Sequence, residues 1–181
     1  MNARKRSASA ASVLLVCLCA NAFADPGPWK VVTFPVDAGM VSSVAIDRDR
    51  VAVGQTSGGV TILDTGAAKP VAVSDKAFGP KGRILSLTWF EGDLWIASQK
   101  GLFRYGSAAT GIEHGQEGVP AGIRTGVRTM RSQGDALWCA TLRRLARVES
   151  GGKNRYKEWF FPVEIDPTCV LRVGGRVLVG T

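Results

Sequence analysis

Short apolar runs separated by turns rich in glycine and aspartate follow one another along the chain, without the 3.6-residue period of amphipathic helices. The run at residues 94–98 (LWIAS) recurs 43 residues later at 137–141 (LWCAT). Related runs stand at 51–55 and 177–181. Each follows a turn-like segment, and an apolar residue stands seven positions before each run. The pattern predicts strand, tight turn and strand, repeated four times.

Two further strands complete the repeating unit. A third apolar run follows at residues 60–63, 102–105 and 145–148, and a fourth strand is indicated at 156–164, which resembles 29–37. Four short strands in about 40–45 residues is the period of a β-propeller blade. We therefore predict an all-β protein, a β-propeller of four-stranded blades with about three and a half blades present in an incomplete ring. A two-sheet β-sandwich is the alternative.

The repeat also predicts the domain organisation. We expect one propeller domain at residues 25–181, with a closing strand at 29–34 that belongs to the last blade. That blade contains its first two strands only, so two explanations stay open. Either the chain is a truncated piece of a longer protein, or several copies self-associate to close one ring. The repeat units are expected near residues 41–74, 84–115, 127–161 and 168–181.

One copy of the repeat resembles a known family. Residues 92–105 (GDLWIASQKGLFRY) are similar to the two-component regulator propeller repeat, which reads roughly gly-x-leu-trp-ile-gly-thr-x-x-gly-leu-x-x-tyr. The copy at 127–148 departs from it at Arg144 and Val148, and the copy at 41–63 lacks the tryptophan. In that family such propellers form the periplasmic sensing part of membrane-bound regulators. The resemblance therefore implies a sensor-type propeller.

Residues 1–24 have the pattern of a secretory signal peptide. Basic residues at positions 4–6 precede an apolar run centred on 13–18, and Ala-Phe-Ala ends at Ala24. We predict cleavage after Ala24 and a periplasmic or secreted protein. The apolar run is too short to span a bilayer, so no membrane span is predicted.

The charge is moderately positive. The full chain carries +8, and loss of the three basic residues of the leader leaves +5, which argues against nucleic acid as a partner. Residues 124–158 hold nine basic and three acidic residues. This excess predicts an anionic ligand or partner, such as a polysaccharide or a phosphate head group, and a solvated surface is the alternative.

Ligands of propellers usually meet the loops at one mouth of the central channel. The loops that join one repeat unit to the next lie at that mouth in our interpretation. The predicted ligand-binding residues are Lys81, Arg83, Arg124 and Arg128.

The tryptophans and cysteines are predicted to be structural. Trp95 and Trp138 align between units, so we expect them to pack rather than to hold a ligand. Cys139 and Cys169 lie in apolar strand-like runs, and the sequence favours two buried free thiols over a disulfide.

No catalytic, metal or cofactor residue is predicted. His114, the one histidine, lies between Glu113 and Glu117, but the flanking glycines favour a loop or an edge strand. We therefore predict a ligand- or protein-recognition module, the N-terminal part of a signalling sensor, rather than an enzyme. A propeller lyase or hydrolase with a site completed by missing blades is one alternative, and a truncated remnant without independent function is the other.

Overall fold

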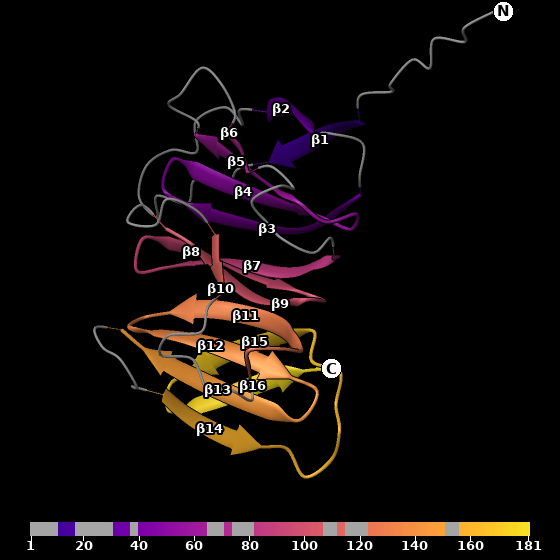
Figure 1. The fold of residues 1–181 in the computed structure, drawn as a ribbon. Coiled ribbons are helices and arrows are strands. Elements are labelled where there is room, and N and C mark those ends of the chain that lie inside the picture. The colour runs from indigo at the N-terminus through magenta and orange to yellow at the C-terminus, as the bar shows by residue number, and fades with distance from the viewer. Residues whose placement is uncertain are drawn as a thin grey trace, which may run out of the picture. The chain divides into compact units, whose positions relative to one another are not determined.

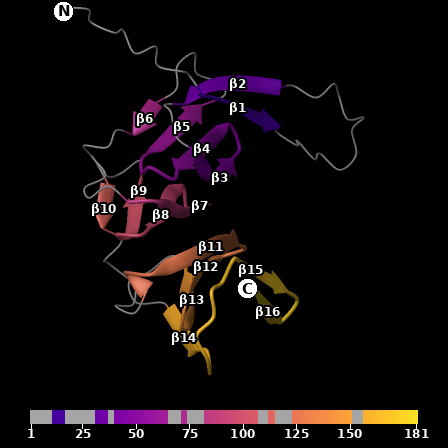
Figure 2. The ribbon, with the colours of Figure 1, turned by 90° about the vertical axis from the view of Figure 1, so that its right-hand side faces the viewer.

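The computed structural model describes residues 11–16, 31–36, 40–64, 71–73, 82–106, 112–114, 123–150 and 156–181. Within these ranges the chain forms β-strands in five antiparallel sheets and no α-helix, which confirms the all-β prediction (Figures 1 and 2). The described sheets do not close into a ring. The chain divides into two compact units, residues 1–40 and 41–181.

The first unit contains one two-stranded sheet. Strand β1 (Ala11–Val16) pairs antiparallel with β2 (Val31–Val36). The expected closing strand at 29–34 overlaps β2, whose described partner is β1 rather than a strand of the last sheet. Residues 29 and 30 lie outside the described residues. Signal-peptide cleavage and ring closure stay predictions.

The second unit contains three four-stranded sheets and a final hairpin, each with its strands in sequential order. The first sheet consists of β3 (Val41–Asp47), β4 (Arg50–Gln55), β5 (Val60–Asp64) and β6 (Val71–Val73). The second consists of β7 (Ile84–Phe90), β8 (Asp93–Ser98), β9 (Gly101–Tyr105) and β10 (Ile112–His114). The third consists of β11 (Val127–Gln133), β12 (Ala136–Thr141), β13 (Arg144–Glu149) and β14 (Tyr156–Phe160). The last consists of β15 (Cys169–Val173) and β16 (Arg176–Gly180).

A two-residue turn joins the first and second strands of every sheet of the second unit. The first turn residue has a positive φ in each: Arg48 at 52°, Glu91 at 53°, Gly134 at 65° and Gly174 at 58°. Such backbone angles match the right-handed twist of a tight hairpin. The glycine- and aspartate-rich segments therefore form the turns that the sequence predicts.

A β-bulge and a hydroxyl group recur in the first strands. The register shifts just before Ser43, Ser86 and Thr129, which lie 43 residues apart. Ser43 Oγ accepts a hydrogen bond from the Leu87 amide, and Ser86 Oγ accepts one from the Met130 amide, both at 3.0 Å. The bulges at Ser43 and Ser86 therefore each turn a hydroxyl toward the next sheet and tie two successive first strands together.

The core lies between successive sheets. In the three four-stranded sheets the second strands are buried on both faces, β8 and β12 along their whole length, whereas β16 of the last hairpin is partly exposed. One hydrophobic cluster joins the first and second sheets, another joins the second and third, and the last joins the third sheet to β15–β16. The absence of a polar face on these strands, predicted from the sequence, is confirmed.

We expect the substitution Ser86→Ala to lower the free energy of unfolding by about 1–3 kcal/mol, because it leaves the Met130 amide without its buried acceptor. Urea denaturation followed by circular dichroism measures the change. Ser42→Ala is the control, because the buried Ser42 hydroxyl has no hydrogen-bond partner among the described residues and its loss should be close to neutral. Equal effects of the two substitutions would contradict the proposed link between the sheets.

Candidate functional site

Three of the four residues predicted to bind a ligand lie at one end of the second sheet. The Arg83 carbonyl accepts a hydrogen bond from the Gln99 amide at 3.1 Å, and the Arg124 carbonyl accepts one from the Leu102 amide at 2.9 Å. Both bonds fix the loops before β7 and β11 beside the β8–β9 turn. Arg128 follows in β11, and Lys81 lies outside the described residues.

Arg128 lies in an open groove of about 560 Å³, which we call the arginine groove. The groove runs over the β8–β9 turn, the start of β11 and the β12–β13 turn, so it brings together three turns that are distant in sequence. The sequence prediction missed Arg143 and Arg144, because only the fold places the β12–β13 turn beside the start of β11. The groove is lined by Leu85, Ser98, Gln99, Thr125, Gly126, Arg128, Thr141, Leu142, Arg143, Arg144 and Glu164.

Two hydroxyl groups shape the turns of the arginine groove. Ser98 Oγ accepts a hydrogen bond from the Lys100 amide at 3.0 Å. Thr141, which lies 43 residues later, accepts bonds from the amides of Arg143 and Arg144 at 3.3 and 3.0 Å. Serine and threonine commonly stabilise turns in this way. The same local rule therefore places Arg143 and Arg144 at the rim of the groove.

Each arginine of the groove faces one carboxylate at 3.1–3.6 Å. Partly exposed ion pairs of this kind contribute little to stability in water, so an incoming anion competes with them at small cost. The pairs are Arg128 with Asp166, Arg143 with Glu164 and Arg144 with Glu158.

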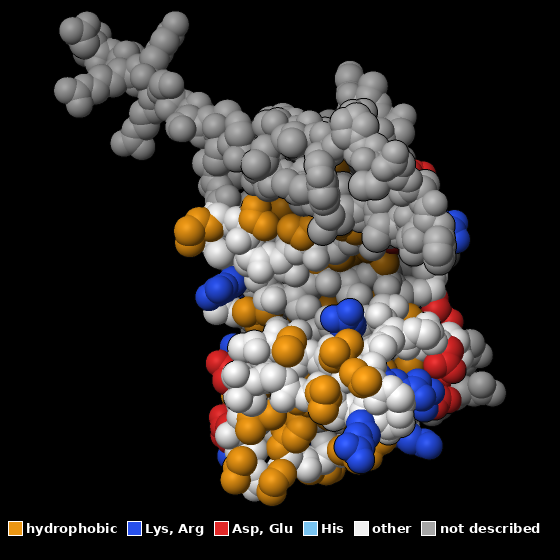
Figure 3. Space-filling view, turned by 180° about the vertical axis from the view of Figure 1, so that it is seen from behind, with side chains coloured by type: hydrophobic (Ala, Val, Ile, Leu, Met, Phe, Trp, Pro, Cys, Tyr) orange, Lys and Arg blue, Asp and Glu red, His pale blue; other side chains and the backbone are white. Residues whose placement is uncertain are grey.

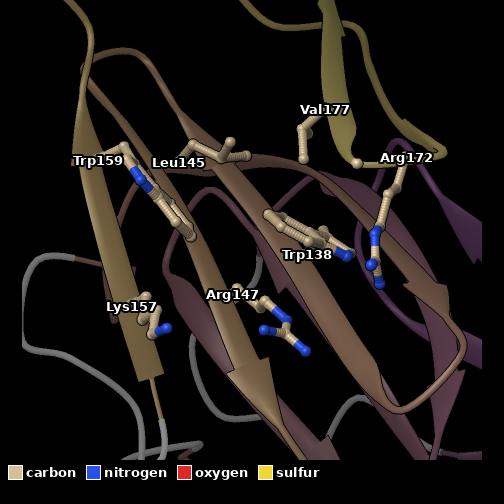
Figure 4. Close-up of a pocket in the computed structure, with 8 residues that line it drawn as sticks. Trp138, Leu145, Arg147, Lys157, Trp159, Arg172 and Val177 are labelled. Atoms are coloured by element: carbon tan, nitrogen blue, oxygen red, sulfur yellow. The ribbon is translucent and has the colours of Figure 1, made fainter.

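A second cavity of about 380 Å³, which we call the tryptophan pocket, lies between the third sheet and the last hairpin (Figure 4). Its two tryptophan rings are stacked, with centroids 5.9 Å apart and planes at 21°. Seen from behind, hydrophobic side chains gather on the part of the second unit that contains the third sheet and the last hairpin (Figure 3). The lining residues are Trp138, Leu145, Arg147, Lys157, Trp159, Arg172, Gly175 and Val177.

The predicted packing role of Trp95 and Trp138 is confirmed, because each is 5% exposed and belongs to a cluster between two sheets. Trp138 has a second feature that the alignment of repeats did not reveal. It lines the tryptophan pocket, and its buried indole Nε1 has no hydrogen-bond partner in the part of the chain that the structure describes.

The two cysteines differ from each other. Cys139 is fully buried, and burial raises the pKa of its thiol from 9.0 to about 12. Cys169 is also a free thiol but is exposed, so the prediction that both are buried is wrong for it. In the repeat, Cys169 stands at the position that Ser43 and Ser86 hold in earlier units. The side chains of those two serines contact the first strand of the next sheet, and no described strand lies against β15 in that way.

Nothing in the described part of the chain forms a cluster of metal-binding side chains with three or more His, Cys, Asp or Glu residues. His114 lies in β10, at the edge of the second sheet, and Glu117 lies outside the described residues. No helix among the described residues has the length and hydropathy needed to cross a membrane.

The comparisons with known proteins show structural likeness only. No family model and no curated protein matches the sequence. The computationally designed protein Ika4 is 13% identical, over 80% of this chain and 87% of that protein, with a TM-score of 0.58. The extracellular domain of BT4673, assigned as a one-component system of B. thetaiotaomicron, is 22% identical over 79% of this chain, with a TM-score of 0.59.

The extracellular domain of BT3049, assigned as a hybrid two-component system of the same organism, is 18% identical over 77% of this chain, with a TM-score of 0.55. Likenesses at these identities show a shared fold. This chain spans only about a fifth of the two extracellular domains, at 19% and 20% of their lengths.

Proposed function

We propose that the chain is a ligand-recognition part of a periplasmic or secreted sensor built as a β-propeller, and that the arginine groove binds an anionic ligand. The convergence in one groove of Arg128, from the start of β11, with Arg143 and Arg144, from the β12–β13 connection, carries this proposal. An anion that displaces the exposed carboxylates of Asp166 and Glu164 gains several charge-assisted hydrogen bonds at once. Polysaccharides with carboxylate or sulfate groups have the repeated charge that such a groove fits.

Three observations support a propeller-type sensor. Each four-stranded sheet is one repeat unit, and the first strands of successive sheets of the second unit contact one another, as the blades of a propeller do. Two similar structures are extracellular domains of signalling systems. The predicted signal peptide and the resemblance to the two-component regulator propeller repeat agree with such a location. The role as the N-terminal part of a longer sensor belongs to the same proposal.

Binding of an anionic oligosaccharide tests the function. We expect the full chain to bind an oligogalacturonate and not a neutral galactan of the same length, with affinity that falls as salt rises. Arg128→Glu and Arg143→Glu should each weaken binding about tenfold or more, because each replaces an attraction with a repulsion. Isothermal titration calorimetry measures the affinities.

Arg48→Glu is a control with the same change of charge. Arg48 lies in the β3–β4 turn, outside the arginine groove, and the matching turn of the second sheet carries Glu91 at nearly the same φ. The control should therefore fold and bind as the wild type does. If it weakens binding as strongly as Arg128→Glu does, the groove is not the binding site.

A further inference from the structure

Two of the carboxylates that face the arginine groove come from one short segment. Residues 161–168 connect β14 to β15, and we call this segment the acidic strap. Glu164 Oε2 lies 3.1 Å from Arg143 Nη2, and Asp166 Oδ1 lies 3.6 Å from Arg128 Nε. The acidic strap therefore supplies the partners of two of the three arginines that line the groove.

The backbone of the acidic strap is fixed beside the β12–β13 connection. The Phe161 amide donates to the Arg143 carbonyl, and the Ile165 amide donates to the Leu142 carbonyl, both at 2.9 Å. Two prolines within the strap also restrict its φ angles. The strap backbone therefore stays in place whether or not its acidic side chains are engaged.

The acidic side chains of the strap can leave the arginines by rotation alone. The side chains of Glu164 and Asp166 are 51% and 78% exposed, so each can turn into solvent while the backbone hydrogen bonds persist. Exposed ion pairs of this kind are weak in water. The two arginines can therefore exchange the strap acids for another anion.

Arg144 is held differently from the other two arginines. Its partner is Glu158 of β14, whose side chain is only 18% exposed, and its guanidinium lies 4.8 Å from the centroid of the Phe160 ring. Both contacts come from the third sheet itself. The acidic strap therefore controls Arg128 and Arg143, while Arg144 stays in place.

The strap acids also remove the net charge of these side chains. The three arginines that line the groove face three carboxylates, so together they are neutral. With Glu164 and Asp166 turned away, the same set carries two positive charges. A positive groove attracts anions from a distance, and a neutral one does not.

The preceding boundary shows that the fold does not require these ion pairs. The described residues just before β11, at 123–126, contain no acid. Leu85 and Lys100 stand 43 residues before Arg128 and Arg143. The arginines and their acids therefore occur together at one boundary, where they serve something other than the formation of a blade.

A tethered acid is a strong competitor of a free ligand. The strap holds its carboxylates beside the arginines at an effective concentration of about millimolar or more. An anion with one charge exchanges one ion pair for another and still loses its freedom of motion. A chain with linked charges can engage Arg128 and Arg143 in a single binding event.

We propose that Glu164 and Asp166 are an internal competitor that occupies the arginine groove until a chain of linked anionic groups displaces them, which rests on the anion-binding function proposed above. The two acids lower the affinity for every anion and so keep single-charge anions out of the groove. Bound ligand holds Arg128 and Arg143, and the strap acids point into solvent.

Removal of the strap charges tests the proposal in the full chain. We expect the double variant Glu164→Gln/Asp166→Asn to bind oligogalacturonate about tenfold more tightly than the wild type, and each single variant about threefold more tightly. Glutamine and asparagine keep the size of the side chains and remove only the charge. Isothermal titration calorimetry at one fixed low salt concentration gives the affinities.

Asp49→Asn/Glu91→Gln is the matched control. It removes two negative charges from exposed residues of the β3–β4 and β7–β8 turns, outside the arginine groove. We expect it to bind oligogalacturonate as the wild type does. A gain as large as that of the strap variant would assign the effect to overall charge and overturn the proposal.

A double-mutant cycle tests the pairing of each acid with its arginine. In the Arg128→Gln background, Asp166→Asn should no longer raise the affinity, whereas Glu164→Gln still should, because its partner is Arg143. A merely structural role of the strap would not produce this pattern. Equal gains from Asp166→Asn in both backgrounds would contradict the proposal.

The binding data separate this proposal from the proposed function. If the wild type and the strap double variant bind oligogalacturonate equally well, the groove binds anions and the internal competitor is wrong. If neither protein binds, the anion-binding function is wrong, and the internal competitor falls with it. Binding by the strap double variant alone would support both.

Discussion

Replacing Trp95 by alanine is expected to lower the free energy of unfolding by about 3–5 kcal/mol. Trp95 is 5% exposed and packs in the cluster between the second and third sheets, with Leu137 and Cys139 of β12. The substitution opens a cavity between two sheets that are held by turns and bulges, so the surroundings collapse only partly. Urea denaturation followed by far-UV circular dichroism measures the loss without depending on tryptophan fluorescence.

Phe160→Ala is the matched control for Trp95→Ala. Phe160 is 67% exposed, and its described ring contact is the Arg144 guanidinium, 4.8 Å from the ring centroid. We expect a loss of no more than about 1 kcal/mol from this substitution. A similar loss for both variants would mean that the cluster between the second and third sheets does not hold the fold together.

The buried thiol of Cys139 is expected to make the protein less stable in alkali. Its pKa is raised from 9.0 to about 12 by burial, so between these pH values the unfolded chain loses the proton and the folded chain keeps it. The unfolded state then binds fewer protons, and stability falls as pH rises through this window. The contribution of this one group approaches about 1.4 kcal/mol per pH unit.

Comparison with Cys139→Ala isolates that contribution. The difference in unfolding free energy between the wild type and Cys139→Ala should shift in favour of the variant as pH rises above 9. Urea titrations at several alkaline pH values measure this difference. A constant difference for Cys139→Ala would contradict the assignment.

The repeat made the strands and turns predictable. Because the units recur at a nearly constant offset, a clear signal in one unit, such as the run at 94–98, identified weaker copies at 51–55 and 177–181. The positive φ of Arg48 was not evident from the residue type, since arginine has no preference for it. Only its alignment with Gly134 marked that position as a turn.

Contacts between sheets were harder to predict than the strands. Ser43 and Ser86 are small polar residues within apolar strands, and their bonds to the next sheet depend on a bulge that has no residue signature. The sequence pattern also does not show which strand packs against Cys169, and for that reason the prediction that Cys169 is buried was wrong. The arginine groove was predicted in part, because Arg128 lies in a loop-proximal position but Arg143 comes from another turn.

The serine bonds between first strands give the second unit the character of a linear array. Ser43 and Ser86 each link one sheet to the next, so a sheet is stabilised by its nearest neighbours and hardly at all by those further away. The second sheet contributes both the Leu87 amide that donates to Ser43 and the Ser86 hydroxyl that accepts from Met130 of the third sheet. Such a chain can lengthen by gene duplication without redesign of the sheets already present.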